Sequence, residues 1–369
     1  EELIISNGYP FEEHEVTSED GYIITLHRIP RSKSADATKK ARRQVVLLQH
    51  GLLASSDTFL FQGAQIDLPY LLADAGYDVW LSNMRGNFYS TKHRTLDPNK
   101  DPEYWKFSLH EVGYYDLPAV IDHVLNRTKE TSLYFIGHSI GSSVGMILGS
   151  LRPEYNSKIK LHISLSPLVY VLHDKSLPHR MIIQIFKSLA ENIISDDILN
   201  IFPRRKYFSD LMHSFCSNDA PTHMLCLLLT YSLVGVNEEF NTNLIPDLVS
   251  YFPAGSSIYL LSHTTQIYLE GNFRPLDYKD SSTNLRKYRS LEPPVYNISS
   301  VTHPISLHYS DGDYLVTKQD IKYILERLPN TVGMFEVPFK EFNHIDFIVG
   351  TKAKELLYDD LILLMNKYK

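Results

Sequence analysis

The feature that most constrains the fold is a serine enclosed by glycines between an apolar run and a helical run. Residues 133–136 are apolar or aromatic, as in a buried strand, and residues 144–151 favour a helix. Between them lies Gly137-His138-Ser139-Ile140-Gly141. A sharp strand-to-helix turn strains the backbone of its central serine and leaves no room for neighbouring Cβ atoms, so it needs glycines. The pattern therefore predicts a nucleophile elbow with Ser139 at its tip.

The competing interpretation is an ordinary turn in which Ser139 caps the following helix. A serine hydrolase with this elbow also needs an acid and then a histidine later in the chain. A strand-like run at 304–310 leads into Asp311-Gly312-Asp313, and His344 follows another strand-like run at 336–339. Acid and histidine thus occur in the required order, which favours the catalytic interpretation of Ser139.

The chain resembles the acid lipases, the family of gastric lipase and lysosomal acid lipase, along nearly its whole length. The similar stretches are 8–10, 19–23, 28–30, 48–55, 73–81, 85–87, 115–119, 137–139 and 342–347. The resemblance implies an α/β-hydrolase fold, with a mainly parallel sheet, helices on both faces, and an inserted, largely helical cap or lid. It also implies a lipase that hydrolyses neutral lipid esters, either triacylglycerols or steryl esters.

The resemblance assigns the catalytic roles to Ser139 as nucleophile, His344 as base and Asp313 as the acid that orients the imidazole. Two other carboxylates compete with Asp313. Asp311 lies two residues earlier and is expected to be a solvated turn residue, whereas Asp346 is too close in sequence to His344 to orient it easily. We therefore expect the triad Ser139-Asp313-His344.

The expected oxyanion hole consists of the backbone N–H groups of Leu52 and Ile140. Leu52 follows the buried strand 45–49 in the segment His50-Gly51-Leu52-Leu53, where the fold places its second donor. Ile140 is a departure, because the family usually carries Gln after the nucleophile. This departure changes the side-chain packing of the loop and leaves the backbone donor in place.

Three further polar residues are expected to have structural roles. Asp116 precedes Ser139, which is the wrong chain order for the acid of this triad. His138 is held in the elbow and should pack or hydrogen-bond locally. Arg85 is expected to fix its loop through hydrogen bonds to backbone carbonyls.

Strands alternate with helices at both ends of the chain but not in its middle. We expect residues 1–170 and 302–369 to form one discontinuous hydrolase core. Residues 171–301, here called the inserted segment, should form the cap, with helices near 181–189 and 224–233. The apolar run 224–229 is either a buried helix or, as the family favours, a lid face that meets lipid at a lipid–water interface.

Composition excludes several other classes of protein. The net charge of −7 argues against a nucleic-acid partner, and no apolar run approaches the length of a transmembrane anchor. The expected chemistry needs no metal and no organic cofactor. The chain begins at Glu1 without an apolar leader, which we interpret as a mature form lacking its signal peptide. The family resemblance implies that it is secreted or lysosomal.

The two cysteines, Cys216 and Cys226, are either buried thiols or a local disulfide. Similar cysteines lie in the family's cap, and an oxidising compartment favours the disulfide. Asn126 and Asn297 begin glycosylation sequons and are the expected acceptors.

A catalytically silent lipid-binding relative is the alternative function for this chain, because lipase folds can serve as carriers. Loss of a triad residue would have indicated a carrier. Ser139, Asp313 and His344 are all present, so the sequence favours an enzyme.

Overall fold

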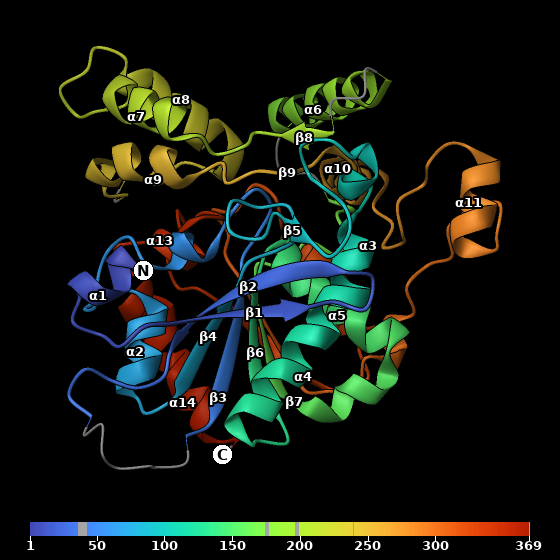
Figure 1. The fold of residues 1–369 in the computed structure, drawn as a ribbon. Coiled ribbons are helices and arrows are strands. Elements are labelled where there is room, and N and C mark those ends of the chain that lie inside the picture. The colour runs from blue at the N-terminus through green and yellow to red at the C-terminus, as the bar shows by residue number, and fades with distance from the viewer. Residues whose placement is uncertain (36–42, 174–176, 196–198, 239, 369) are drawn as a thin grey trace.

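A computed structural model of the protein describes residues 1–35, 43–173, 177–195, 199–238 and 240–368. Its centre is a sheet in which the strands follow the order β1-β2-β4-β3-β6-β7-β10-β11 (Figure 1). The strands are β1 (Glu12–Thr17), β2 (Tyr22–Ile29), β3 (Val45–Gln49), β4 (Asp78–Ser82), β5 (Lys92–His93), β6 (Leu133–His138), β7 (Ile159–Leu165), β10 (Ile305–Tyr309) and β11 (Thr331–Glu336). Neighbours from β4 to β11 are parallel, whereas β1 and β2 form an antiparallel edge.

Helices cover both faces of this sheet, as predicted (Figure 1). One face carries α3 (Leu109–Glu111), α4 (Leu117–Thr128), α5 (Ile140–Leu151) and α12 (Lys318–Leu325). The other carries α1 (Glu2–Ser6), α2 (Leu68–Asp74), α13 (Asp346–Val349) and α14 (Asp359–Asn366). Strand β6 is buried on both faces, because Phe135 enters the first core whereas Tyr134 and Ile136 enter the second. A fully apolar strand is typical of such a central, parallel position.

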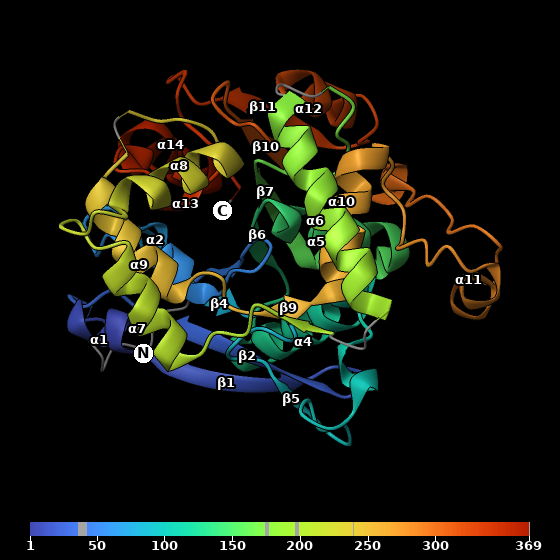
Figure 2. The same cartoon turned by 90° about the horizontal axis from the view of Figure 1, so that it is seen from above.

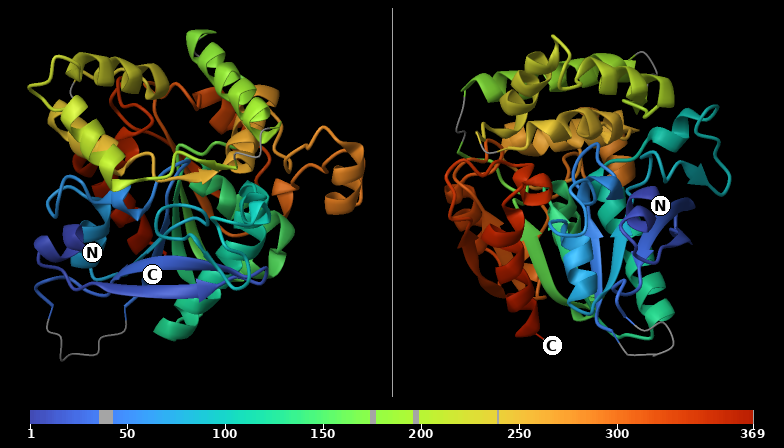
Figure 3. Two further views of the ribbon diagram at one scale, coloured as in Figure 1. Left: turned by 45° about the horizontal axis from the view of Figure 1, so that its top comes forward. Right: turned by 90° about the vertical axis from the view of Figure 1, so that its left-hand side faces the viewer.

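The inserted segment lies above the carboxyl ends of the strands (Figures 1 and 2). Its elements are α6 (Leu177–Ser195), β8 (Asn200–Ile201), α7 (Lys206–Phe215), α8 (His223–Val234), α9 (Ile245–Tyr251), β9 (Ser256–Ser257), α10 (Ile258–Glu270) and α11 (Ser281–Tyr288). Helix α11 projects to the side, away from the other helices of this segment (Figure 3). Strands β8 and β9 pair with each other and were not expected from the sequence.

Short helices complete the connections between these elements. Turns of 3₁₀ helix span Ser56–Phe59, Pro102–Trp105, Pro153–Lys158, Thr242–Leu244 and Ile298–Ser300, and π-helical turns span Val112–Asp116 and Lys354–Tyr358. The first π-helical turn lies between α3 and α4 and interrupts an otherwise continuous helical stretch. Pro118 has no N–H to donate to the preceding turn, which favours such a bulge.

The predicted disulfide is present and joins Cys216, after α7, to Cys226 in α8. The apolar run in α8 is divided between two environments. Cys226 and Leu227 are buried, whereas Met224, Leu225, Leu228 and Leu229 are each about half exposed or more, up to 62% for Met224. Among the described helices, none is both long enough and apolar enough to cross a membrane.

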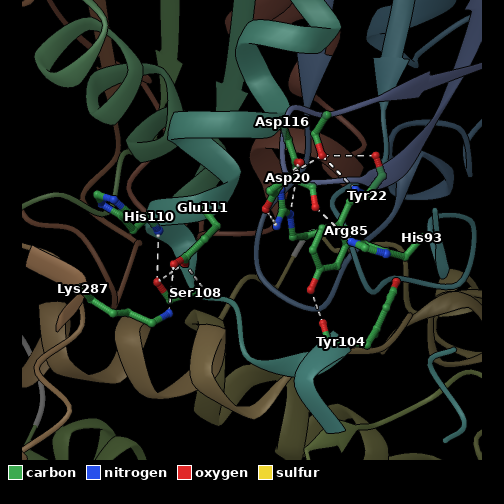
Figure 4. Close-up of polar contacts among 11 residues, drawn as sticks. Asp20, Tyr22, Arg85, His93, Tyr104, Ser108, His110, Glu111, Asp116 and Lys287 are labelled. Atoms are coloured by element: carbon green, nitrogen blue, oxygen red, sulfur yellow. Dashed lines mark hydrogen bonds and ion pairs between the residues drawn. The ribbon is translucent and has the colours of Figure 1, made fainter. Parts of the chain in front are cut away.

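The loop after β4 is held by ion pairs, so the prediction that Arg85 binds backbone carbonyls was wrong. The guanidinium is buried, donates from Nη1 to Asp20 at 2.7 Å and from Nε to Asp116 at 2.8 Å, and lies over the Tyr22 ring (Figure 4). A buried cation needs opposite charge as well as hydrogen bonds. Burial raises the pKa of Asp116 to about 6, against the opposing charge of Arg85. Asp116 is therefore structural, as expected.

Candidate active site

Ser139 occupies the turn between β6 and α5 in a strained conformation, with φ 57° and ψ −126°. The flanking glycines are required by close packing. A Cβ on Gly137 would lie 2.5 Å from the Ser142 nitrogen, and one on Gly141 would lie 2.4 Å from the Gln49 carbonyl oxygen. The Ser139 side chain therefore stands at the carboxyl edge of the sheet, at the amino end of α5. Strain of this kind is typical of functional turns.

His344 and Asp313 meet at this same edge of the sheet. Nδ1 of His344 lies 2.8 Å from Oδ2 of Asp313, and both side chains are buried. The other carboxylate oxygen accepts the backbone N–H groups of Leu315 at 2.7 Å and Val316 at 3.1 Å. Burial alone would raise the pKa of Asp313, but His344 and the hydrogen bonds hold it below its usual value. Asp313 is therefore suited to orient an imidazole, whereas Asp311 is exposed.

Ser166 is a member of this cluster that the sequence analysis missed. It follows β7, has φ 45°, donates its hydroxyl proton to Oδ2 of Asp313, and lies 3.1 Å from Nδ1 of His344. Strand β7 pairs with β6 so that Leu165 lies opposite His138, which brings Ser166 beside the elbow. A serine at the end of the strand-like run 161–166 was the only sequence signal, and the strand order was needed to use it.

His138 links the elbow to the histidine loop. Its Nε2–H donates to the His344 carbonyl oxygen at 2.9 Å, and the two rings are 4.8 Å apart. This contact spans 206 residues, so it is not the local one expected from the sequence. Burial lowers the pKa of His138 to about 3 and keeps the ring neutral. Within the described residues no hydrogen bond joins the Ser139 hydroxyl to His344. His138 directly precedes Ser139, so its contact holds the His344 loop against the elbow.

The loop that carries Leu52 is fixed by His50. Nδ1–H of His50 donates to the Gly51 carbonyl at 2.8 Å, and Nε2 accepts the Met84 N–H at 3.0 Å. Burial lowers the pKa of His50 to about 4, so the ring is neutral. A neutral imidazole with its proton on Nδ1 can make both of these hydrogen bonds. A Cβ on Gly51 would lie 3.2 Å from the Ser139 Cβ. Because a peptide's N–H points opposite to its C=O, holding the Gly51 carbonyl also fixes the direction of the Leu52 N–H.

Ile140, the other predicted oxyanion donor, is the first residue of α5 and is fully buried. An N–H in the first turn of a helix has no intrahelical acceptor, and the helix dipole there favours negative charge. Within the described part of the chain, no group of His, Cys, Asp or Glu side chains is arranged to hold a metal ion.

Comparison with known proteins gives consistent matches. Residues 44–351 match the family described as "alpha/beta hydrolase fold", and residues 1–63 match the "Partial alpha/beta-hydrolase lipase region". The chain is 39% identical over 369 residues to Lipase 1 of Drosophila melanogaster, covering 100% of this chain and 79% of that protein. It is 35% identical over 369 residues to gastric triacylglycerol lipase of Homo sapiens, covering 100% of this chain and 91% of that protein. A soluble variant of monoglyceride lipase from Saccharomyces cerevisiae has the same fold, with a TM-score of 0.58, 14% identity, and coverage of 98% and 95%.

Proposed function

Because this chain belongs to the α/β-hydrolase lipases and is a carboxylic ester hydrolase, we propose that Ser139, His344 and Asp313 are its catalytic triad. The observation that carries this proposal is the buried His344–Asp313 hydrogen bond of 2.8 Å beside the strained Ser139. Further support is that Ser139, Asp313 and His344 come from distant parts of the chain and lie in loops at the carboxyl edge of the sheet. Ser166 donates a hydrogen bond to the same Asp313 oxygen that faces His344.

In the first half of the reaction, Ser139 Oγ attacks the ester carbonyl carbon as its proton passes to Nε2 of His344. The tetrahedral intermediate then collapses, and the alcohol leaves with the proton from His344. Asp313 holds Nδ1 protonated throughout, so Nε2 is the atom that accepts and returns protons. The product of this half is an ester between Ser139 and the fatty acid.

In the second half, His344 takes a proton from water as the water oxygen attacks the acyl-enzyme carbonyl. Collapse of the second intermediate breaks the bond to Ser139 Oγ, which regains its proton from His344. The free fatty acid is released, and the enzyme returns to its starting state. The backbone N–H groups of Leu52 and Ile140 stabilise the negative oxygen in both halves.

We expect Leu52→Pro to lower kcat by about 10²–10³-fold, because proline removes one oxyanion donor. Ile140→Gln should change kcat only modestly, because it keeps the backbone N–H and alters side-chain packing. Proline also restricts φ, so melting temperatures must be compared before rates are interpreted. The assignment of the oxyanion hole fails if folded Leu52→Pro keeps near-normal kcat, or if Ile140→Gln costs as much.

The proposed substrates are neutral lipid esters, either triacylglycerols or steryl esters, taken from a lipid–water interface. The support is the exposed apolar surface of the inserted segment, to which α8 contributes Met224 and Leu228 and α7 contributes Phe208 and Leu211. These exposed side chains favour the lid interpretation of run 224–229 over a wholly buried helix. We therefore propose that residues 171–301 form a cap that meets lipid and admits acyl chains to the site.

The test is hydrolysis of emulsified tributyrin and of cholesteryl oleate by the whole protein. Release of fatty acid from either supports the proposal, and the ratio of the two rates shows which ester class the site prefers. If neither emulsion is hydrolysed while the protein still binds to it, the protein is instead a silent lipid-binding relative.

A secreted or lysosomal location is also part of the proposal. The Cys216–Cys226 disulfide is typical of oxidising compartments. Asn126 and Asn297, the proposed glycosylation sites, are both exposed, as acceptors must be.

A further inference from the structure

The chain directly after α8 leaves the inserted segment's outer surface and binds the loop of the catalytic histidine. The His344 N–H donates to the Val234 carbonyl at 3.2 Å, and Nδ2 of Asn343 donates to the Gly235 carbonyl at 3.0 Å. Nδ2 of Asn237 donates to Oδ2 of Asp346 at 2.7 Å. Residues 234–237, here called the strut, therefore contact the histidine loop before, at and after His344.

The contact with Asp346 passes directly to the histidine loop. The same oxygen that accepts from Asn237 also accepts the backbone N–H of Asn343 at 2.7 Å. Asn237, Asn343 and Asp346 are all buried, and buried hydrogen bonds to a carboxylate are stronger than exposed neutral ones. Asp346, a rival acid by sequence, thus binds the loop backbone and the strut, while Asp313 binds the imidazole.

The strut also packs against the loop of the catalytic acid. Gly235 has φ 111°, and a Cβ there would lie 2.3 Å from the Gly312 carbonyl oxygen and 3.1 Å from the Asn343 Cβ. Only glycine fits this conformation at this distance. The strut therefore touches the residue before Asp313 and the residue before His344 at one point, so its position constrains both.

We propose that Asn237 is a positioning residue that acts through Asp346 to hold His344 in line with Ser139. The inference rests on the proposed function, since it concerns the same base. The inserted segment then has a role in the chemical step that is separate from its contact with lipid: when the strut is docked, the base is aligned.

The test uses a soluble ester, p-nitrophenyl butyrate, so that binding to a lipid surface does not enter the measurement. Asn237→Ala should lower kcat by about 10- to 100-fold, the loss expected when a reacting group is misplaced by about 1 Å, and should leave KM nearly unchanged. Asn241→Ala is the matched control. It lies in the same segment, and among the described residues its side chain accepts a local hydrogen bond from the Asn243 N–H at 3.2 Å, so Asn241→Ala should behave as the parent does.

A double-mutant cycle separates positioning from general loss of structure. If Asn237 acts through Asp346, adding Asn237→Ala to Asp346→Ala should cost little beyond Asp346→Ala alone. Should either alanine variant fail to fold, Asn237→Ser with its shorter side chain is measured in the same way. The inference is overturned if the folded Asn237 variant keeps the parental kcat, loses only in KM, or adds its full effect to that of Asp346→Ala.

Ser139→Ala is assayed alongside these variants, so that failure of the proposed triad can be distinguished from failure of the proposed role of Asn237. Full activity in Asn237→Ala with none in Ser139→Ala overturns the role of the strut alone. Activity in folded Ser139→Ala overturns the proposed triad, and the positioning role with it.

Discussion

Replacing Ser139 by alanine should lower kcat for ester hydrolysis on the order of 10⁶-fold, because no acyl-enzyme can form without the hydroxyl. The fold should persist. Serine and alanine both carry a Cβ, so the strain at φ 57° is unchanged and only one oxygen atom is lost. The rate of p-nitrophenyl butyrate hydrolysis at saturating substrate would check the loss of kcat. The melting temperature would check that the fold persists.

Covalent labelling gives this prediction an independent readout. Diethyl p-nitrophenyl phosphate should leave one phosphoryl adduct on the parent, detectable as a mass increase, and none on Ser139→Ala. Ser157→Ala is the matched control, because Ser157 is exposed and, among the described residues, its hydroxyl donates to the nearby Glu154 carbonyl. Substantial turnover by a folded Ser139→Ala protein would place the nucleophile elsewhere.

Replacing Asp313 by asparagine should lower kcat by about 10⁴-fold, the loss typical of this change in the triad of a serine protease. The hydrogen bonds explain why. One oxygen of Asp313 accepts the Leu315 and Val316 N–H groups, so an asparagine would keep its carbonyl oxygen there and turn its NH₂ toward His344. Nδ1 would then have to accept a hydrogen bond from that NH₂, so the single ring proton of the neutral imidazole would lie on Nε2. An imidazole in that tautomer cannot take the proton from Ser139.

Asp311→Asn is the control for this change, since Asp311 is exposed and lies just before Asp313 in the chain. Its kcat should match that of the parent. Because the pKa of Asp313 is held below its usual value, the carboxylate stays charged at mildly acidic pH, and the difference between the two variants should persist there. An inactive Asp311→Asn beside an active Asp313→Asn would reverse the assignment of the acid.

The sequence predicted the fold class and the order of the site's candidate residues because both leave local signals. The glycines around Ser139 indicate a tight turn, and polar residues that follow apolar runs indicate the carboxyl ends of strands. The strands expected at 45–49, 133–136 and 304–310 and the helices on both faces are present in the structure. The run at 336–339 was misplaced, because β11 spans Thr331–Glu336 and ends where that run begins.

Contacts that depend on three-dimensional assembly could not be predicted in the same way. Ser166 meets Asp313 only because β7 lies between β6 and β10. The partners of Arg85, Asp20 and Asp116, come from a hairpin turn and a helix on either side of it in the chain. The bond between His138 and the His344 carbonyl depends on how two loops pack at the end of the sheet. None of these pairings has a fixed spacing in sequence.

The inserted segment is anchored on both sides of the candidate catalytic centre, which limits how it can be exchanged during evolution or engineering. The Ala254 N–H donates to the Leu53 carbonyl at 2.7 Å, beside one proposed oxyanion donor, while Asn237 binds Asp346 beyond His344. A chimera in which another lipase's segment replaces residues 171–301 must preserve both attachment points, at Ala254 and at Asn237. It must also preserve the outer helices with exposed apolar side chains. If the exchanged piece lacks these two contacts, the proposed base and the proposed oxyanion loop each lose a hydrogen-bonded support. We therefore expect such a chimera to lose turnover even where it gains the donor's substrate preference.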